Sequence, residues 1–268
     1  MLEAKKQKTS VVFGKQKNLL LLVAFLFFTH NVFSNDAIKA LLEKAVTAQK
    51  KYQETTAIDL YKKVLKIDSL NFTALYNIAY IYQRQGWLEE GINNEKSKQL
   101  YTEFKKYALT SYRHYPETFE GNVLMAGASA RMARFLPAKE RVHAAWDIKK
   151  YADIAYKINP NHADVLHMLA WWNYELQKPT WLERKLSDLL FGGLPKGASM
   201  ENAFLYLQKA IKINPDYLVY FYDMAVFYLH TGNEVKAKEY LNKAISMKPN
   251  SPEEVQYLDL SKKKLASI

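Results

Sequence analysis

Apolar residues recur at helical spacing through most of this 268-residue chain, and the pattern is clearest over residues 218–251. This stretch, LVYFYDMAVFYLHTGNEVKAKEYLNKAISMKPNS, has alanines at its positions 8, 20 and 27, a glycine at 15 and a proline at 32. Small residues let two antiparallel helices approach closely, the glycine permits the turn between them, and the proline ends the second helix. The stretch therefore predicts one helix pair of a repeating array.

The same register returns elsewhere in the chain. Second helices of a pair are expected at 57–71, where Ser69 replaces the proline, at 148–162 and at 203–217. First helices are expected at 72–86, at 163–176 and, less regularly, after Pro116. Four of the eight prolines close these units: Pro116, Pro160, Pro215 and Pro249.

The register matches the tetratricopeptide repeat, and no strand signal interrupts it. We therefore predict an all-α, tetratricopeptide-type solenoid of five helix pairs forming one superhelical domain over residues 35–268. The spacing of the prolines leaves three insertions, which predict extra helices among the pairs. The segment 252–265 begins with proline and ends in lysines, so we expect it to cap the array.

The longest insertion carries a resemblance to a known family. The sequence TWLERKLSDLLFGGLP (180–195), followed by SMENAFLYLQKAIKINPDY (199–217), resembles the regulator of microtubule dynamics family of tetratricopeptide proteins. The resemblance spans roughly residues 105–265. It implies a non-catalytic scaffold, often membrane-anchored, that contacts other proteins or membranes. The connector GGLPKGAS departs from the more proline- and serine-rich connector of that family.

The first 34 residues have the pattern of a secretory signal peptide. Five lysines precede the apolar run LLLLVAFLFF (19–28), and Val32 and Ser34 suit a cleavage after residue 34. We therefore expect an exported protein, in the periplasm of a Gram-negative bacterium, for which microtubules would not be the partner. The alternative is an uncleaved anchor in the inner membrane formed by residues 19–33.

Removal of this segment lowers the formal net charge from +11 to +7, because five lysines and one glutamate leave with it. The remaining positive charge is mild and lies in helices without an arginine-rich tract, so a nucleic-acid partner is not expected. The chain has no cysteine, which excludes disulfides, thiol catalysis and zinc–thiolate sites.

The glycine-rich stretch FGGLPKGAS (191–199) invites comparison with a phosphate-binding loop. No strand precedes it, however, and Lys196 comes before Gly197 rather than after a glycine. We expect a structural connector, with Ser199 as the N-cap of the next helix and Glu201 in its first turn. Histidine, carboxylate and serine motifs of metal or catalytic sites are also absent from the sequence, so we predict no cofactor, no metal and no enzymatic activity.

In this type of repeat the first helix of each pair lines the concave face, chiefly through positions 5, 9, 12 and 13. Aromatic side chains with polar tips at these positions are typical of contact surfaces. The predicted partner-binding residues, here named the inner-face set, are Tyr76, Tyr80, Arg84, Arg131, His167, Trp171, Tyr174, Tyr222, Val226 and His230.

The inner-face set predicts a scaffold that holds a peptide or a partner protein in an aromatic groove. One alternative is that the inserted helices bury these rings as core. Another is a lipid- or membrane-surface module with an apolar cavity between the inserted helices. We expect Trp172 and Trp181 to pack against the inserted helix of the longest insertion. Tetratricopeptide modules that grip chaperone tails use lysine at position 5 and asparagine at position 9. Both residues are missing here, and we do not expect this mode of binding.

Overall fold

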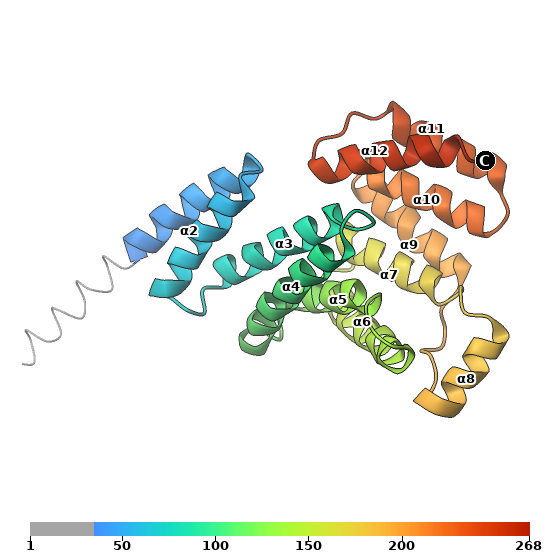
Figure 1. The fold of residues 1–268 in the computed structure, drawn as a ribbon, viewed down its shortest axis with the longest axis horizontal. Coiled ribbons are helices and arrows are strands. Elements are labelled where there is room, and N and C mark those ends of the chain that lie inside the picture. Colours follow the sequence, from blue (N-terminus) through green and yellow to red (C-terminus); the bar gives the residue numbers. More distant parts are fainter. Residues whose placement is uncertain (1–34) are drawn as a thin grey trace, which may run out of the picture. The chain divides into compact units, whose positions relative to one another are not determined.

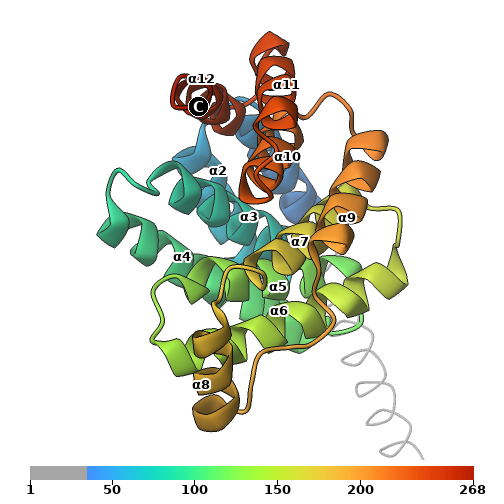
Figure 2. The same ribbon diagram turned by 90° about the vertical axis from the view of Figure 1, so that its right-hand side faces the viewer.

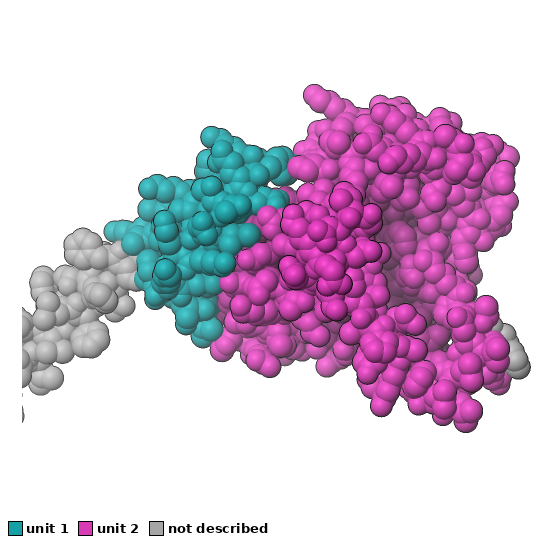
Figure 3. Space-filling view, viewed as in Figure 1, with its two compact units in different colours: residues 1–74 teal, residues 75–268 magenta. Residues whose placement is uncertain are grey.

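The computed structural model describes residues 35–268, and the predicted signal segment lies outside this part of the chain. The chain divides into two compact units, residues 1–74 and 75–268 (Figure 3). The described residues form helices joined by turns, without any strand, which confirms the all-α prediction. Across residues 35–268, no helix combines the length and apolarity needed to cross a lipid bilayer.

The first unit contains a helix at residues 35–50 and α2 (Glu54–Ile67), joined by a tight turn in which Tyr52 takes a positive φ of 56°. The Tyr61 hydroxyl donates to Gln49 Oε1 at 2.8 Å and so connects the two helices. Apart from the fully buried Tyr61, the buried side chains of this pair are small or branched, which allows close approach of the helices: Ala45, Ala48, Ala57, Ile58 and Val64.

The second unit contains most of the helices (Figures 1 and 2). Its helices are α3 (Phe72–Leu88, which begins in the first unit), α4 (Asn94–His114), α5 (Phe119–Ala133), α6 (Ala138–Ile158), α7 (Ala163–Glu175), α8 (Trp181–Phe191), α9 (Met200–Ile213), α10 (Leu218–His230), α11 (Glu234–Ser246) and α12 (Pro252–Leu265). Within the unit, α5 packs on α6, α7 on α9, and α10 on α11. These are the helix pairs that the repeat register predicts.

The small residues of the repeat lie where the helices of a pair meet. Ala225 in α10 and Ala237 and Ala244 in α11 are fully buried, and Ala203 and Ala210 are equally buried in α9. Gly232 has a φ of 75° in the turn between α10 and α11, a backbone conformation that glycine adopts without strain. The register therefore predicted both the packing and the turn correctly.

The prediction of several extra helices was wrong in number. Both α4 and α6 are 21 residues long, against 13 for α11, so two of the insertions extend second helices. Only the third insertion forms a separate helix, α8. The physical reason is that neither α4 nor α6 contains a glycine or proline, whereas Pro179, Gly192 and Pro195 bound α8.

The glycine-rich stretch after α8 is a connector, as expected. Gly192, Gly193 and Gly197 all have a φ near 80–85°, which turns the chain away from α8. Ser199 caps α9 by accepting a hydrogen bond from the Asn202 amide, and Glu201 lies in the first turn of that helix. These features confirm the predicted start of α9.

Of the two tryptophans assigned to packing against the inserted helix, Trp172 needs a correction. The buried Trp172 indole donates to the Ala145 carbonyl in α6 at 2.9 Å, so the second helix of the preceding pair holds it. The side chain of Trp181 is outside the described part of the structure. Instead, Trp146 of α6 reaches the α8 connector and donates to the Gly193 carbonyl at 3.0 Å.

Candidate functional site

The first helices of the second unit, α3, α5, α7 and α10, carry the whole inner-face set. In Figure 3 the face of this unit is hollowed near its centre. The structure divides the predicted residues among a partly exposed ladder on α3, a carboxylate cluster between α7 and α10, and an arginine network at the end of α5.

The ladder on α3 consists of Tyr76, Tyr80 and Arg84, which are spaced four residues apart and so share one face of the helix. The Tyr76 and Tyr80 rings stack with centroids 6.4 Å apart and planes 16° apart. The Arg84 guanidinium lies 5.8 Å from the centroid of the Tyr80 ring, a cation–π contact. Tyr80 is 39% exposed, whereas Tyr76 and Arg84 are half-buried, so the Tyr80 ring is the most accessible part of this α3 ladder.

Between α7 and α10 the structure places a carboxylate that the sequence analysis did not single out. Asp223 is fully buried, and its Oδ2 accepts a hydrogen bond from the Trp171 indole at 2.9 Å. His167 Nε2 lies 2.5 Å from the same oxygen. Asp223 Oδ1 is buried without a hydrogen-bond partner among the described residues. The carboxylate thus fixes the orientation of two inner-face side chains.

Two other members of the inner-face set pack into the core beside this cluster. Tyr174 is only 6% exposed and stacks on Phe227 with ring centroids 4.6 Å apart. Val226 is half-buried and packs against the hydrophobic cluster that contains Tyr174 and Phe227. His230 is exposed at the end of α10 and touches Tyr174 edge-on at 5.2 Å. Burial at Tyr174 leaves little of that ring for a partner.

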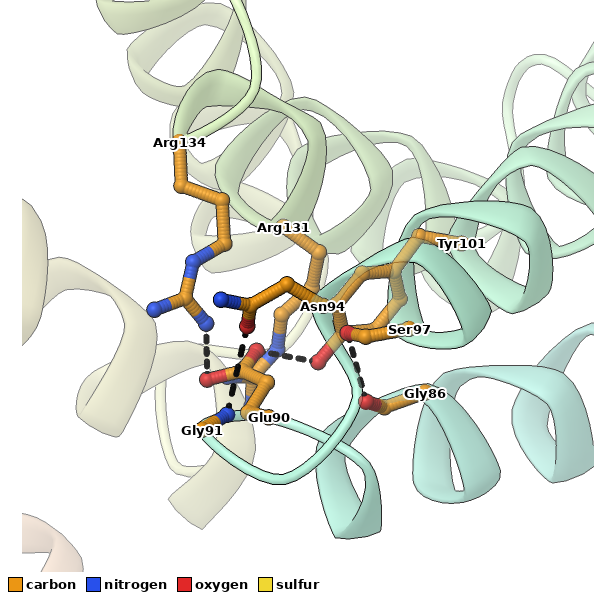
Figure 4. A network of polar contacts seen from close by, with 8 residues as sticks. All are labelled: Gly86, Glu90, Gly91, Asn94, Ser97, Tyr101, Arg131 and Arg134. Atoms are coloured by element: carbon orange, nitrogen blue, oxygen red, sulfur yellow. Dashed lines mark hydrogen bonds and ion pairs between the residues drawn. The ribbon is translucent and has the colours of Figure 1, made fainter.

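At the end of α5, Arg131 belongs to a network of polar contacts centred on Glu90 (Figure 4). Arg134 pairs with Glu90 Oε2, the Tyr101 hydroxyl donates to Glu90 Oε1, and Arg131 Nη1 lies 3.6 Å from Oε1. Burial alone would lower the pKa of Arg131, but Tyr101 and Glu90 outweigh burial and raise that pKa. The network ties the loop after α3 to α4 and α5.

The C-terminal helix α12 does more than cap the array. Its Tyr257 stacks on Trp87 of α3, with centroids 4.6 Å apart and planes 10° apart, and meets Tyr222 of α10 at 5.2 Å. Glu253 of α12 accepts a hydrogen bond from the Tyr217 hydroxyl at 3.0 Å. The last helix therefore reaches back to the first helix pair of the second unit, and Tyr222 contacts α12.

Burial and nearby carboxylates keep the inner tyrosines protonated. Burial raises the pKa of Tyr76 to about 12, with Asp164, Tyr80 and Glu120 adding to the effect. Burial likewise raises the pKa of Tyr174 to about 12, with Glu175 and Asp223 contributing. At neutral pH these phenols are hydrogen-bond donors and acceptors without charge.

Sequence reasoning missed Asp223, Trp87, Tyr257 and Glu90. One signal was available for Asp223, because it is the only charged residue in the otherwise apolar first helix LVYFYDMAVFYLH before its terminal histidine. The contacts of Trp87 with Tyr257 join distant parts of the chain and leave no local pattern. In the described part of the chain, no group of three or more histidine, aspartate or glutamate side chains is placed to hold a metal ion.

Solved structures with a similar fold are tetratricopeptide and related proteins. A thermophilic tetratricopeptide protein from Thermus thermophilus aligns with a TM-score of 0.60 at 15% identity, covering 84% of this chain and 99% of that one. The pilF protein of Pseudomonas aeruginosa aligns with a TM-score of 0.52 at 12% identity, covering 87% and 89% of the two chains. At these identities the likeness concerns the fold, and it confirms the tetratricopeptide-type solenoid.

Relatives by sequence carry one common name. Regulator of microtubule dynamics protein 1 of Caenorhabditis elegans is 25% identical over 171 residues, which cover 64% of this chain and 75% of that protein. The rat protein of the same name is 24% identical over 167 residues, covering 61% of this chain and 53% of the relative. For the human protein the match is 23% over 125 residues and covers 40% of its length. The match thus spans about half or less of these mammalian relatives.

A family model described as regulator of microtubule dynamics protein 1-3 matches residues 41–268. The match is longer than the stretch 105–265 on which the resemblance was expected, and it includes the α3 ladder, the Asp223 cluster and α8. The chain belongs to the regulator of microtubule dynamics family.

Proposed function

We propose that this protein is a non-catalytic scaffold that binds a segment of a partner protein along the α3 ladder. The tetratricopeptide-type fold supports a protein-interaction scaffold in general, and the ladder supports the particular surface. The observation that carries the proposal is that Tyr80 remains exposed beside Arg84 while most other large rings of the unit are packed. Tyrosine and arginine are the residue types that contribute most to binding energy at interfaces.

The charges at the two ends of the α3 ladder differ in sign. Near Tyr76 the field comes from the carboxylates of Asp164 and Glu120, which help raise the pKa of that phenol. The other end carries Arg84, followed by the arginine pair around Glu90. A bound segment would therefore be oriented, with a basic side chain toward Tyr76 and an acidic one toward Arg84.

Most other residues of the inner-face set are occupied by contacts within the unit. Tyr174 is core, Trp171 and His167 are held by Asp223, and Tyr222 is in contact with Tyr257 of α12. We therefore place the main contact surface on α3, with Arg131 beside Glu90 at its margin. This is narrower than a groove lined by every first helix.

Peptide selection on the full chain tests the proposal. A random peptide library would be selected on the wild-type protein, and the enriched peptides measured by fluorescence polarisation against Tyr80→Ala, Arg84→Ala and, as control, Val235→Ala. Val235 is 78% exposed on α11, away from the α3 ladder in sequence and on a second helix of its pair. We expect binding to weaken at least about tenfold in each ladder variant, or about 1.4 kcal/mol, and to stay unchanged in the control.

Two results would overturn the proposal. One is an enriched set of peptides that binds the ladder variants as tightly as the wild type. The other is a selection that enriches no peptide above the background of a selection without the protein. Helicity measured by circular dichroism on every variant ensures that a loss of binding is local.

The alternative of a lipid held in a cavity between inserted helices has a narrower basis, because α8 is the one separate inserted helix in the described chain. The observation that favours contact with lipid is on the outer surface of α8 and is developed below.

We also propose that residues 1–34 direct export to the periplasm. The support is the order of basic residues, the apolar run at 19–28 and the small residue at position 34. Sequencing of the mature N-terminus from a fractionated cell tests this. A start at Asn35 in the periplasmic fraction is expected, and an intact N-terminus in the inner-membrane fraction would favour the anchor formed by residues 19–33.

A further inference from the structure

Helix α8 presents a stripe of leucines to solvent. Leu182, Leu186, Leu189 and Leu190 are 59%, 46%, 80% and 60% exposed. At 100° per residue these four side chains fall within an arc of about 100°, so they form one continuous face of the helix. Exposed leucines are ordinary when scattered, but a contiguous apolar face on one helix marks a contact surface.

The leucines of α8 do not form its buried side, unlike those of a normal surface helix, and Glu183, Lys185 and Asp188 are exposed with them. The sheltered side carries Ser187, which is buried with its Oγ unpartnered among the described residues, and the half-buried Phe191. On the same side Arg184 turns back, and its guanidinium donates to the carbonyls of Leu176 and Pro179. A helix that only covered the core would bury its leucines and expose serine and arginine.

This orientation is fixed at both ends of the helix. Thr180 and Glu183 form a capping box at the N-terminus, and Gly192 ends the helix in the left-handed conformation. The Trp146 indole holds the Gly193 carbonyl from α6. In Figure 1, α8 lies at an edge of its unit, where it contacts α6. The leucine face is therefore presented by the fold and is not a frayed end.

The size and charge of the surface indicate its occupant. Four partly exposed leucines offer an apolar patch of a few hundred Å², which is well below the roughly 800 Å² that each partner gives to a stable interface. A membrane surface requires less, because a helix lying in the interface immerses only its apolar face. The segment 178–196 has four basic and two acidic residues, and Lys185 is exposed at the edge of the leucine stripe.

We propose that α8 docks with its leucine face on a membrane surface that contains anionic lipid. The leucines enter the boundary between headgroups and acyl chains, while Lys178, Lys185 and Lys196 remain at the level of the headgroups. This inference concerns the outer surface of the unit and does not depend on peptide binding at the α3 ladder.

The absence of cysteine in the chain allows a site-specific test with the full-length protein. Leu189→Cys would be labelled with an environment-sensitive fluorophore and mixed with vesicles of phosphatidylcholine, with or without phosphatidylglycerol. Asp188→Cys, on another face of the same helix, and Val235→Cys, on α11, are labelled as controls. Because residues 19–28 could bring the whole chain to a vesicle, the local response at position 189 is the measurement that decides.

With vesicles containing phosphatidylglycerol, we expect the emission of the label at position 189 to move to shorter wavelength and gain intensity. The labels at 188 and 235 should change little. Adding Lys185→Glu to the Leu189→Cys protein should reduce the response, and vesicles of pure phosphatidylcholine should give a weaker one.

Three outcomes would overturn the proposal. The first is no response at position 189 with anionic vesicles, and the second is the same response at positions 189, 188 and 235. The third is a response at 189 that grows with protein concentration in the absence of vesicles, which would assign the leucine face to a second copy of the chain. Peptide binding at the α3 ladder is measured separately and is unaffected by any of these results.

Discussion

Replacing Gly86 by alanine tests the closest approach between α3 and α4. A Cβ at this position would lie 2.6 Å from Tyr101 Cε1 and 2.7 Å from Cδ1. The Tyr101 ring is fully buried, and its hydroxyl donates to Glu90, so it has no free space into which to move. The Ser97 hydroxyl also donates to the Gly86 carbonyl at 2.8 Å and holds α4 against this residue (Figure 4).

Two effects of opposite sign determine the size of the change. Overpacking of a buried site costs about 1–3 kcal/mol, and a ring that is held at both ends places Gly86 near the upper limit. Alanine regains about 1 kcal/mol over glycine in a helix interior. We therefore expect the free energy of unfolding to fall by about 2 kcal/mol, equivalent to a decrease of about 4–8 °C in the melting temperature for a chain of this size.

Urea unfolding followed by far-UV circular dichroism measures this change, and Gly127→Ala is the matched control. Gly127 is also in a helix interior, but its added Cβ would meet Phe104 Cζ at 3.4 Å, an ordinary contact distance. The control should be as stable as the wild type or more stable by up to about 1 kcal/mol. If Gly86→Ala unfolds at the same urea concentration as the control, the steric argument is refuted.

Three further predictions concern the candidate site. Asp223→Ala empties a fully buried position and leaves the half-buried Trp171 indole without its acceptor, so we expect urea titration to show a loss of about 2–4 kcal/mol in the free energy of unfolding. A loss below about 1 kcal/mol would contradict this role. Trp87→Ala removes the ring stacked on Tyr257, so hydrogen exchange measured by mass spectrometry should accelerate in α12 and not in α8. Unchanged exchange in α12 would argue against the contact. Burial raises the pKa of Tyr76 and Tyr174 to about 12, whereas unfolded tyrosine ionises near pH 10. The stability that the two protonated phenols contribute is therefore complete below about pH 10, and it is lost as the pH rises toward about 12. Melting temperatures measured from about pH 9 to about 12 check the last prediction, and a constant value across that range would disprove it.

The parts of the fold that depend on short-range spacing could be predicted from sequence. Ala225, Ala237 and Ala244 recur with the 34-residue register because each helix pair requires close approach at the same points. Ser199 and Pro252 likewise mark helix starts through interactions with the next few residues. The lengths of α4 and α6 could also have been predicted, since neither segment contains a residue that would end a helix.

The arrangement of the inner side chains could not be predicted in the same way. Repeat positions place Tyr80 and Tyr174 in equivalent helices, yet one ring is exposed and the other is stacked on Phe227. The difference arises from neighbours on other helices, whose identity the register does not constrain. The return of α12 to Trp87 is likewise a contact between the two ends of the second unit, and it depends on how the pairs accumulate rotation along the array.

Several buried polar atoms of the second unit lack a hydrogen-bond partner among the described residues, and two of these places concern the surfaces described above. Asp223 is buried with one carboxylate oxygen unpartnered, and Ser187 is buried while the leucines of α8 face solvent. Both arrangements destabilise the isolated fold, because burial of an unpaired polar group and exposure of apolar surface each raise its free energy. The alanine positions of the repeat, by contrast, are packed as its register requires. Departures of this kind in natural proteins concentrate at functional sites. The exposed leucines of α8 are therefore better explained by a surface that covers them in the working protein than by loose packing. The burial of Asp223 is explained by a requirement to orient His167 and Trp171.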